Sequence, residues 1–178
     1  MGLPGSPADE LVVIVDRDNN ITGSTTRRQM RAERLPHRCS YILVFNSRGE
    51  LYVQKRTVIK DIYPGYWDPA AGGVMQTGES YEESAAREVG EELGVRGVEL
   101  GVRGVELRPL FDLWFEDGRS AVWGRAFTCV YDGPLALQTE EVEFVEMMTP
   151  GEVLRRAAAG ETFTPDGLIV VKRYLQGK

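Results

Sequence analysis

The chain has 178 residues, of which 42% are hydrophobic and 27% are charged, and its formal net charge at pH 7 is −6. This length and composition exclude a disordered chain and are typical of a globular protein of ordinary domain size. The acidic balance argues against a protein that grips a nucleic-acid polymer, although a few local cations could still hold a small nucleotide.

No membrane partner and no secretion signal are expected. The longest aliphatic run, residues 11–15, is far too short to span a membrane, and no charged-then-apolar leader precedes it. Cys39 and Cys129 each lie in an apolar run that predicts a strand. Buried free thiols are therefore expected instead of a disulfide, which is typical of a cytoplasmic protein.

The first part of the chain predicts a short extension. Residues 1–8, rich in Gly, Pro and Ser, predict a flexible N-terminus. The apolar run at residues 10–16 predicts a strand, and residues 21–24 predict a short strand that pairs back on it. Residues 26–35 have helical composition, and this helix should stop before Pro36.

Two strands and an irregular loop are predicted next. Residues 38–45 and 51–56 flank a polar loop at residues 46–49, which predicts a hairpin. Residues 60–67 predict an aromatic-rich loop without regular structure. The small residues at 68–74 would let the backbone come close to a ligand or a metal.

A helix is predicted from Ser80 to Leu93. Ser80 and Glu83 have the spacing of a capping box, and Gly94 can take the left-handed conformation that ends a helix. Three apolar residues recur at four-residue steps and form the stripe that should pack on the core: Ala85, Val89 and Leu93.

The same helix carries three carboxylates on one face, because Glu88, Glu91 and Glu92 stand at i, i+3 and i+4. The plain interpretation is a solvated, Glu-rich surface. The chemical interpretation is a site for Mg²⁺ or Mn²⁺, since these hard cations take oxygen ligands and bind substrate phosphates at the same time. The spacing of the surrounding residues decides between the two.

The stretch at residues 73–95 resembles the Nudix box at every specified position. Its constrained residues follow the order Gly73-x5-Glu79-x7-Arg87-Glu88-Val89-x-Glu91-Glu92-x-Gly94-Val95. The resemblance implies an α/β Nudix fold, an α/β/α sandwich with a mixed β-sheet and a loop–helix–loop catalytic motif. It also implies divalent-metal-dependent attack of water on a diphosphate linkage. On this basis residues 9–178 form a single domain, with a core at about residues 37–150 behind the N-terminal extension.

The resemblance also assigns roles within the box. The metal ligands, one of which activates or orients the attacking water, are Glu88, Glu91 and Glu92. The backbone of Gly73 approaches the metal, and Glu79 forms an ion pair with Arg87 that fixes the loop.

Residues 37–67, with the runs HRCSYILVFNSRGELYVQKR and PGYWD, resemble the branch of the superfamily that includes isopentenyl-diphosphate isomerase. The similarity to isomerase-like bacterial Nudix hydrolases extends over nearly the whole chain. In the isomerase an arginine and a lysine of this region contact the substrate diphosphate, and the matching residues here are Arg56 and Lys60. Taken alone, both residues could also be ordinary surface cations.

The isomerase chemistry itself is not expected. The essential cysteine of the isomerase falls at Gly72, and one of its metal-binding histidines falls at Val74. His37, the single histidine of the chain, aligns with another of those ligands, but a lone histidine at the start of a strand is more often structural. A double-bond shift needs an acid and a base on opposite faces of the alkene, and here the second partner is missing.

After the box the heptad GVRGVEL occurs twice in tandem, at residues 94–100 and 101–107. Only the first copy fits the box, so the second predicts a longer loop behind the helix. A strand pair is then predicted at residues 108–116 and 120–131. Five of its aromatic residues either fill the core or stack on a base: Phe111, Trp114, Phe115, Trp123 and Phe127.

Residues 138–148 predict an acidic segment that continues into a strand. Nudix enzymes often draw a further carboxylate ligand or water-orienting group from this region. Glu141 is the residue expected in that role, with Glu140 and Glu143 as alternatives. An exposed acidic loop is the plain interpretation.

Two C-terminal helices, at residues 150–159 and 165–175, should cover the sheet. The sequence thus predicts a cytoplasmic, Mg²⁺- or Mn²⁺-dependent hydrolase of a small-molecule diphosphate. This substrate would be a nucleoside di- or triphosphate or a nucleoside-diphosphate derivative. The alternatives are an isopentenyl-diphosphate isomerase and a Nudix module that binds a nucleotide or a protein without turnover. A monomer and a homodimer are both compatible with the sequence.

Overall fold

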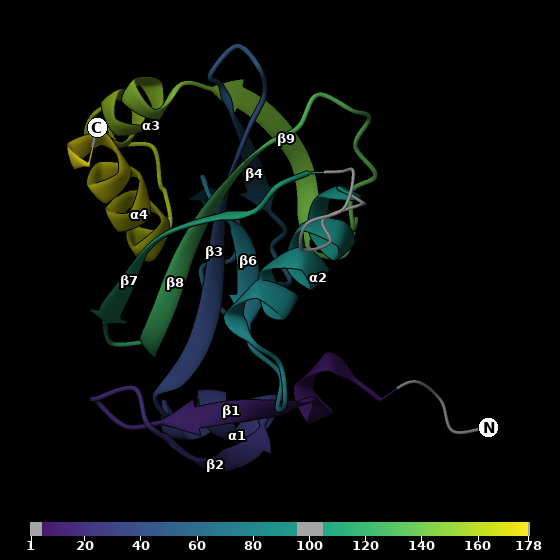
Figure 1. Cartoon of the computed structure of the whole chain (residues 1–178), viewed down its shortest axis with the longest axis vertical. Coiled ribbons are helices and arrows are strands. Elements are labelled where there is room, and N and C mark those ends of the chain that lie inside the picture. The colour runs from purple at the N-terminus through teal and green to yellow at the C-terminus, as the bar shows by residue number, and fades with distance from the viewer. Residues whose placement is uncertain (1–4, 96–104, 178) are drawn as a thin grey trace.

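The structure is a computed structural model that describes residues 5–95 and 105–177. The described residues form a mixed nine-stranded sheet, at whose centre lies β3 (His37–Phe45) (Figure 1). β3 runs parallel to β8 (Ala121–Val130) along its whole length. On its other edge it is antiparallel to β6 (Ala71–Val74). β6 therefore brings the beginning of the Nudix-box stretch to the middle of the sheet.

The other strands widen the sheet on both sides of β3. β4 (Leu51–Arg56) pairs with β9 (Val142–Met148) and, at its end, with β5 (Trp67–Asp68). β7 (Arg108–Glu116) forms an antiparallel pair with β8. The strands β5 and β6 lie in segments for which the sequence predicted no strand. β5 has only two residues and β6 consists mostly of small residues, so their pairing comes from the neighbouring strands.

Helices cover both faces of the sheet (Figure 1). α2 (Tyr81–Leu93) packs on one face, and α3 (Pro150–Ala158) and α4 (Pro165–Gln176) pack on the other. The side chains of β3 alternate between these layers. Val44 belongs to the core under α2, whereas Leu43 belongs to the core under α3 and α4. The α/β/α sandwich with a mixed sheet is therefore confirmed.

The N-terminal extension contributes a hairpin and one helix. β1 (Leu11–Val15) pairs with β2 (Ile21–Thr26), and α1 (Arg27–Glu33) follows directly. A small core of Val12, Met30 and Val74 joins the extension to β6. The extension is thereby anchored beside the box, with α1 next to the first residues of the motif.

The segment predicted to be flexible, residues 1–8, ends in a local turn of helix. Pro7–Asp9 form a short 3-10 helix, and the Ser6 hydroxyl accepts a hydrogen bond from the backbone N–H of Ala8 (3.3 Å). A proline at the first helical position is favourable because its φ is already fixed. Residues 1–4 lie outside the described residues, as does most of the tandem repeat.

The remaining side-chain predictions can be compared directly with the structure. Cys39 and Cys129 are both free thiols, and Cys129 is buried as predicted, whereas Cys39 is partly buried. Phe127 is fully buried, whereas Trp114 and Trp123 are partly exposed and pack on each other with ring centroids 5.7 Å apart. Nowhere in residues 5–95 and 105–177 is there a helix long and apolar enough to cross a membrane.

Candidate active site

The helix α2 begins and ends where the sequence predicts. The Ser80 hydroxyl accepts a hydrogen bond from Glu83 N (3.1 Å), and the Glu83 carboxylate accepts one from Ser80 N (2.8 Å), so the capping box is complete. Gly94 ends the helix in the left-handed region with φ 71°. The apolar stripe of Ala85, Val89 and Leu93 is fully buried. These contacts fix the rotation of α2 and therefore the direction of its glutamates.

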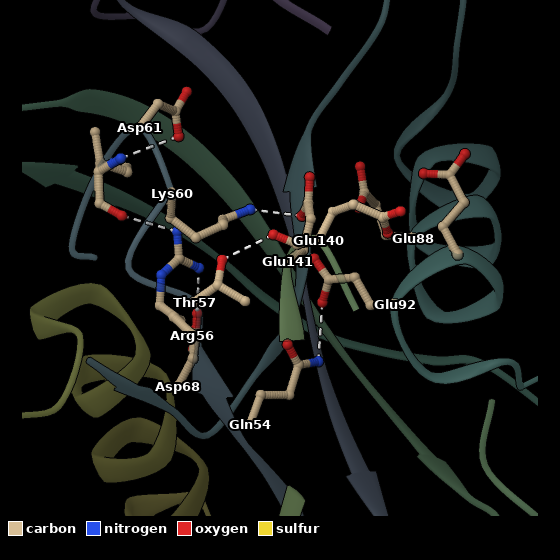
Figure 2. A network of polar contacts seen from close by, with 12 residues as sticks. Gln54, Arg56, Thr57, Lys60, Asp61, Asp68, Glu88, Glu92, Glu140 and Glu141 are labelled. Atoms are coloured by element: carbon tan, nitrogen blue, oxygen red, sulfur yellow. Dashed lines mark hydrogen bonds and ion pairs between the residues drawn. The ribbon is translucent and has the colours of Figure 1, made fainter. Parts of the chain in front are cut away.

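Glu88 and Glu92 are both buried, at 8% and 4% exposure, and both point toward Glu141 (Figure 2). Burial raises the pKa of Glu88 to about 7, and the neighbouring charge of Glu91 adds to this effect. Burial, followed by the repulsion from Glu88, raises the pKa of Glu92 to about 8. Glu91 differs from these two, because its side chain is 49% exposed. The structure therefore places Glu88 and Glu92 in the interior and leaves Glu91 at the solvent-exposed edge of the cluster.

Arg87 connects the helix to the loop before it. Its guanidinium makes a two-pronged ion pair with Glu79, with Nε–Oε1 and Nη2–Oε2 distances of 2.6 and 3.0 Å. Its Nη1 donates to Glu88 (2.8 Å) and to Glu91 (3.2 Å). Glu79 in turn accepts a hydrogen bond from the backbone N–H of Gln76 (2.9 Å). One cation thus neutralises part of the cluster and fixes the loop conformation at once.

The two glycines of β6 leave room for these carboxylates. A Cβ atom on Gly73 would lie 2.6 Å from Oε1 of Glu88, so only glycine permits the observed approach. Gly72 has φ 142°, and a Cβ atom there would lie 1.9 Å from the carbonyl oxygen of Ser40. Position 72, where the isomerase has its cysteine, therefore cannot hold a side chain in this backbone.

Glu141 lies opposite α2 and is held by Lys60, with 2.5 Å between Nζ and Oε2 (Figure 2). The Lys60 side chain is only 10% exposed. The main chain of the loop is bonded to the same segment, because Thr57 N donates to Glu141 O (3.1 Å). The alternatives Glu140 and Glu143 are both exposed. Of the three acidic residues considered in this segment, Glu141 is the one beside the buried glutamates.

Several N–H donors of Arg56 already bond to acceptors within the protein. It donates to the backbone oxygens of Tyr63 (3.2 Å) and Ile62 (2.9 Å) and pairs with Asp68 (3.2 Å). These bonds hold the aromatic loop that carries Lys60. Arg56 also lines a cavity next to Gly73, so its position allows both a structural and a ligand-binding role.

Sequence reasoning missed Gln54. This residue of β4 is 3% exposed, and its Nε2 donates to Oε2 of Glu92 (2.9 Å) (Figure 2). The available signal was an uncharged polar residue directly after the apolar run Leu51–Val53, since a buried amide needs a partner. Gln54 orients the deepest carboxylate of the cluster.

His37 does not join the cluster. It is 1% exposed, its Nδ1 is bonded to the backbone oxygen of Leu35 (2.9 Å), and its Nε2 has no partner. Burial, followed by the nearby charge of Arg31, lowers the pKa of His37 to about 3. A neutral imidazole packed in this way fits the structural interpretation of the lone histidine.

The donor set of the cluster fits a hard divalent cation. Carboxylate oxygens on successive turns of one helix, buried beside a third carboxylate, are the ligands that Mg²⁺ and Mn²⁺ take. In residues 5–95 and 105–177, no group of three or more candidate ligands already has the geometry of a metal site. Glu88, Glu92 and Glu141 are each bonded to a protein donor. A cation would replace those bonds and would offset the burial and the carboxylate repulsion that raise the pKa values of Glu88 and Glu92.

Comparisons with known proteins agree with this geometry. Residues 35–166 match the NUDIX domain. An uncharacterised Nudix hydrolase of Yersinia pestis is 45% identical over 166 residues, covering 93% of this chain and 86% of the relative. The uncharacterised Nudix hydrolase YfcD of Escherichia coli K12 is 44% identical, covering 94% and 87%. A crystal structure from Deinococcus radiodurans superposes with a TM-score of 0.76 at 27% identity, covering 92% of this chain and 98% of that one.

Proposed function

The chain belongs to the Nudix hydrolase family, and we propose that it is a divalent-metal-dependent hydrolase of nucleoside diphosphate derivatives in the isomerase-like branch. Nudix hydrolases act on phosphoanhydride bonds and generally need a divalent cation such as Mg²⁺. The substrate would be a nucleoside di- or triphosphate, or a nucleoside diphosphate linked to another moiety. A cytoplasmic location is expected.

The observation that carries this proposal is the buried pair Glu88 and Glu92 beside Gly73. Burial raises the pKa of Glu88 to about 7 and that of Glu92 to about 8, which destabilises the ionised pair, and perturbed values of this kind cluster at functional sites. The close approach at Gly73 and the ion pair between Arg87 and Glu79 hold the same arrangement in place.

The residues have distinct tasks in this mechanism. Glu88, Glu92 and, from the exposed edge of the cluster, Glu91 would hold the cation, which when bound would neutralise phosphate charge and lower the pKa of a bound water. Glu141, in the turn directly before β9, faces the pair and would orient the attacking water. Lys60, now paired with Glu141, would turn to the substrate phosphates and stabilise the charge that develops on them.

Two alternatives predict different results. An isopentenyl-diphosphate isomerase would need an acid or base at position 72, where the backbone accepts only glycine. A nucleotide-binding module without turnover would not need a buried glutamate pair. Conversion of isopentenyl diphosphate to dimethylallyl diphosphate would support the first alternative, and tight nucleotide binding without product in Mg²⁺ would support the second.

The proposal is tested by a hydrolysis screen. Purified protein is incubated with Mg²⁺ or Mn²⁺ and nucleoside di- and triphosphates, sugar nucleotides, dinucleotides and isopentenyl diphosphate. Glu92→Gln is run in parallel, with Glu82→Gln as the matched control on the same helix. We expect a metal-dependent product that the first variant reduces by about two orders of magnitude or more and the second leaves unchanged. Equal rates for the parent and Glu92→Gln would refute the proposed role of the pair.

A further inference from the structure

A small cavity lies between α1 of the N-terminal extension and the Nudix core. It is lined by Gly72 and Gly73 of β6 and by side chains of α1 and the aromatic loop, and its volume is about 60 Å³. This volume is far below the roughly 300–1,000 Å³ of pockets that hold drug-sized ligands. That room suits one phosphate group, whereas a sugar or a nucleoside is too large for it.

Among the charged side chains that line this cavity, the cations outnumber the carboxylates. Arg27 and Arg31 reach it from α1, and Arg56 and Lys60 reach it from the core, whereas its acidic lining is limited to two residues. Those two are Asp68 and Asp166, and each already accepts hydrogen bonds. Asp68 is paired with Arg56 (3.2 Å), and Asp166 accepts from the hydroxyl of Tyr41 (2.8 Å). Arg27 and Arg31 are therefore the cations of the wall that no carboxylate of the same wall neutralises.

Arg27 and Arg31 stand one helical turn apart and share a single carboxylate. Their Nε atoms lie 3.1 and 3.0 Å from Oδ2 of Asp61. Both side chains are mostly buried, at 18% and 17% exposure, and Nη1 of Arg31 is buried without any hydrogen-bond partner. An unpaired buried N–H of a guanidinium carries a substantial desolvation penalty. Two guanidinium groups held by one carboxylate leave a net positive charge and a free donor, which is the composition of an anion site.

We propose that this cavity is a subsite for a terminal phosphate group and that Arg31 is its principal ligand. The inference rests on the proposed function and narrows it to substrates that end in an unesterified phosphate, such as nucleoside di- and triphosphates. A phosphate in the cavity lies next to Gly73, whose neighbour is the Glu88 carboxylate, so the adjoining phosphorus can reach the glutamate cluster. Sugar nucleotides and dinucleotides carry a bulky group in place of the free phosphate and do not fit.

The first measurement is binding of inorganic pyrophosphate to the metal-free protein by isothermal titration calorimetry. The test variant is Arg31→Gln. The matched control is Arg28→Gln, which makes the same change on the same helix at a side chain that is 66% exposed and paired with Asp9 (2.9 Å). We expect Arg31→Gln to weaken pyrophosphate binding about tenfold and Arg28→Gln to leave it unchanged.

The second measurement is kcat/KM in Mg²⁺ on nucleoside triphosphates and on sugar nucleotides. The parent should prefer the triphosphates, and Arg31→Gln should lower kcat/KM about tenfold for them and less than about twofold for the sugar nucleotides. Arg31→Lys keeps a charge that can pair with Asp61. It should also reduce the preference for triphosphates over sugar nucleotides, but by less than Arg31→Gln does. This second variant retains the test if Arg31→Gln does not fold.

The outcomes separate this inference from the proposed function. Equal pyrophosphate affinity in the parent, Arg31→Gln and Arg31→Lys would overturn the subsite, as would a parent that prefers sugar nucleotides. A protein that binds pyrophosphate through Arg31 but hydrolyses nothing would keep the subsite and refute the hydrolase. Hydrolysis that depends on Glu92 but not on Arg31 would keep the hydrolase and refute the subsite.

Discussion

Replacing Glu92 by glutamine is expected to stabilise the metal-free protein at alkaline pH while it abolishes hydrolysis. Glu92 is 4% exposed, and burial together with the repulsion from Glu88 raises its pKa to about 8. A glutamine has nearly the same shape, and its carbonyl oxygen can accept the hydrogen bond that Gln54 donates. The substitution therefore removes a buried charge and preserves the packing.

The sign and the size of this change in the free energy of unfolding follow from proton linkage. The folded protein binds the Glu92 proton more tightly than the unfolded chain does, because the pKa of a glutamate in the unfolded chain is 4.5. The free energy of unfolding of the parent therefore falls as the pH rises from about 4.5 to about 8. Glu92→Gln has no proton to lose at this position. The variant should be more stable than the parent by ~2–4 kcal/mol at pH 8 and by less than ~1 kcal/mol at pH 5.

The assay is urea denaturation in EDTA at pH 5, 6.5 and 8, with Glu82→Gln as the control. The difference in unfolding free energy between Glu92→Gln and the parent should grow with pH, and the control should show no such trend. Adding Mg²⁺ at pH 8 should stabilise the parent alone and so narrow the gap, because only the parent keeps the full set of ligands. A variant no more stable than the parent at pH 8, or a difference independent of pH, would refute the electrostatic argument.

Three further predictions concern the same cluster. Gly73→Ala should lower kcat at least about tenfold with little change in Tm, because the new methyl group displaces the Glu88 carboxylate; Gly23→Ala, with open space around it, is the control for steady-state kinetics and thermal melting. Gln54→Leu should move the acidic limb of the pH–rate profile to higher pH, because it removes the donor that favours ionised Glu92. An acidic limb at the same pH as in the parent would mean that this bond is not essential. EDTA should abolish hydrolysis, and excess Mg²⁺ or Mn²⁺ should restore it, as measured by phosphate release; activity that persists in EDTA would contradict the metal requirement.

The sequence predicted the helix α2 well because its signals are local. The capping box at Ser80 and Glu83, the left-handed Gly94 and the four-residue apolar stripe all act within a few residues of one another. The predicted pairing of β2 with β1, the helix α1 and the two C-terminal helices rest on signals of the same kind. Local signals of this type do not depend on what packs against the element.

The sequence was a poor guide where function depends on contacts between distant segments. Lys60 and Glu141 are 81 residues apart, and Gln54 lies 38 residues from Glu92. Nothing in the local pattern around Arg31 indicates that it faces Gly73 across a cavity. The strands β5 and β6 were missed for the same reason. β5 has only two residues and β6 consists mostly of small residues of low strand propensity, so the pairing is imposed by β4 and β3.

The geometry also explains why the glutamates are buried at all. An exposed cluster would bind a divalent cation with less repulsion to relieve, since water already screens the charges. In the interior, the repulsion between Glu88 and Glu92 destabilises the metal-free protein and is removed when a cation enters. The relief of this repulsion would therefore add to the affinity for a metal. On this argument, variants that stabilise the metal-free protein by removing buried charge should weaken metal binding in the same order, which calorimetry with Mn²⁺ can measure.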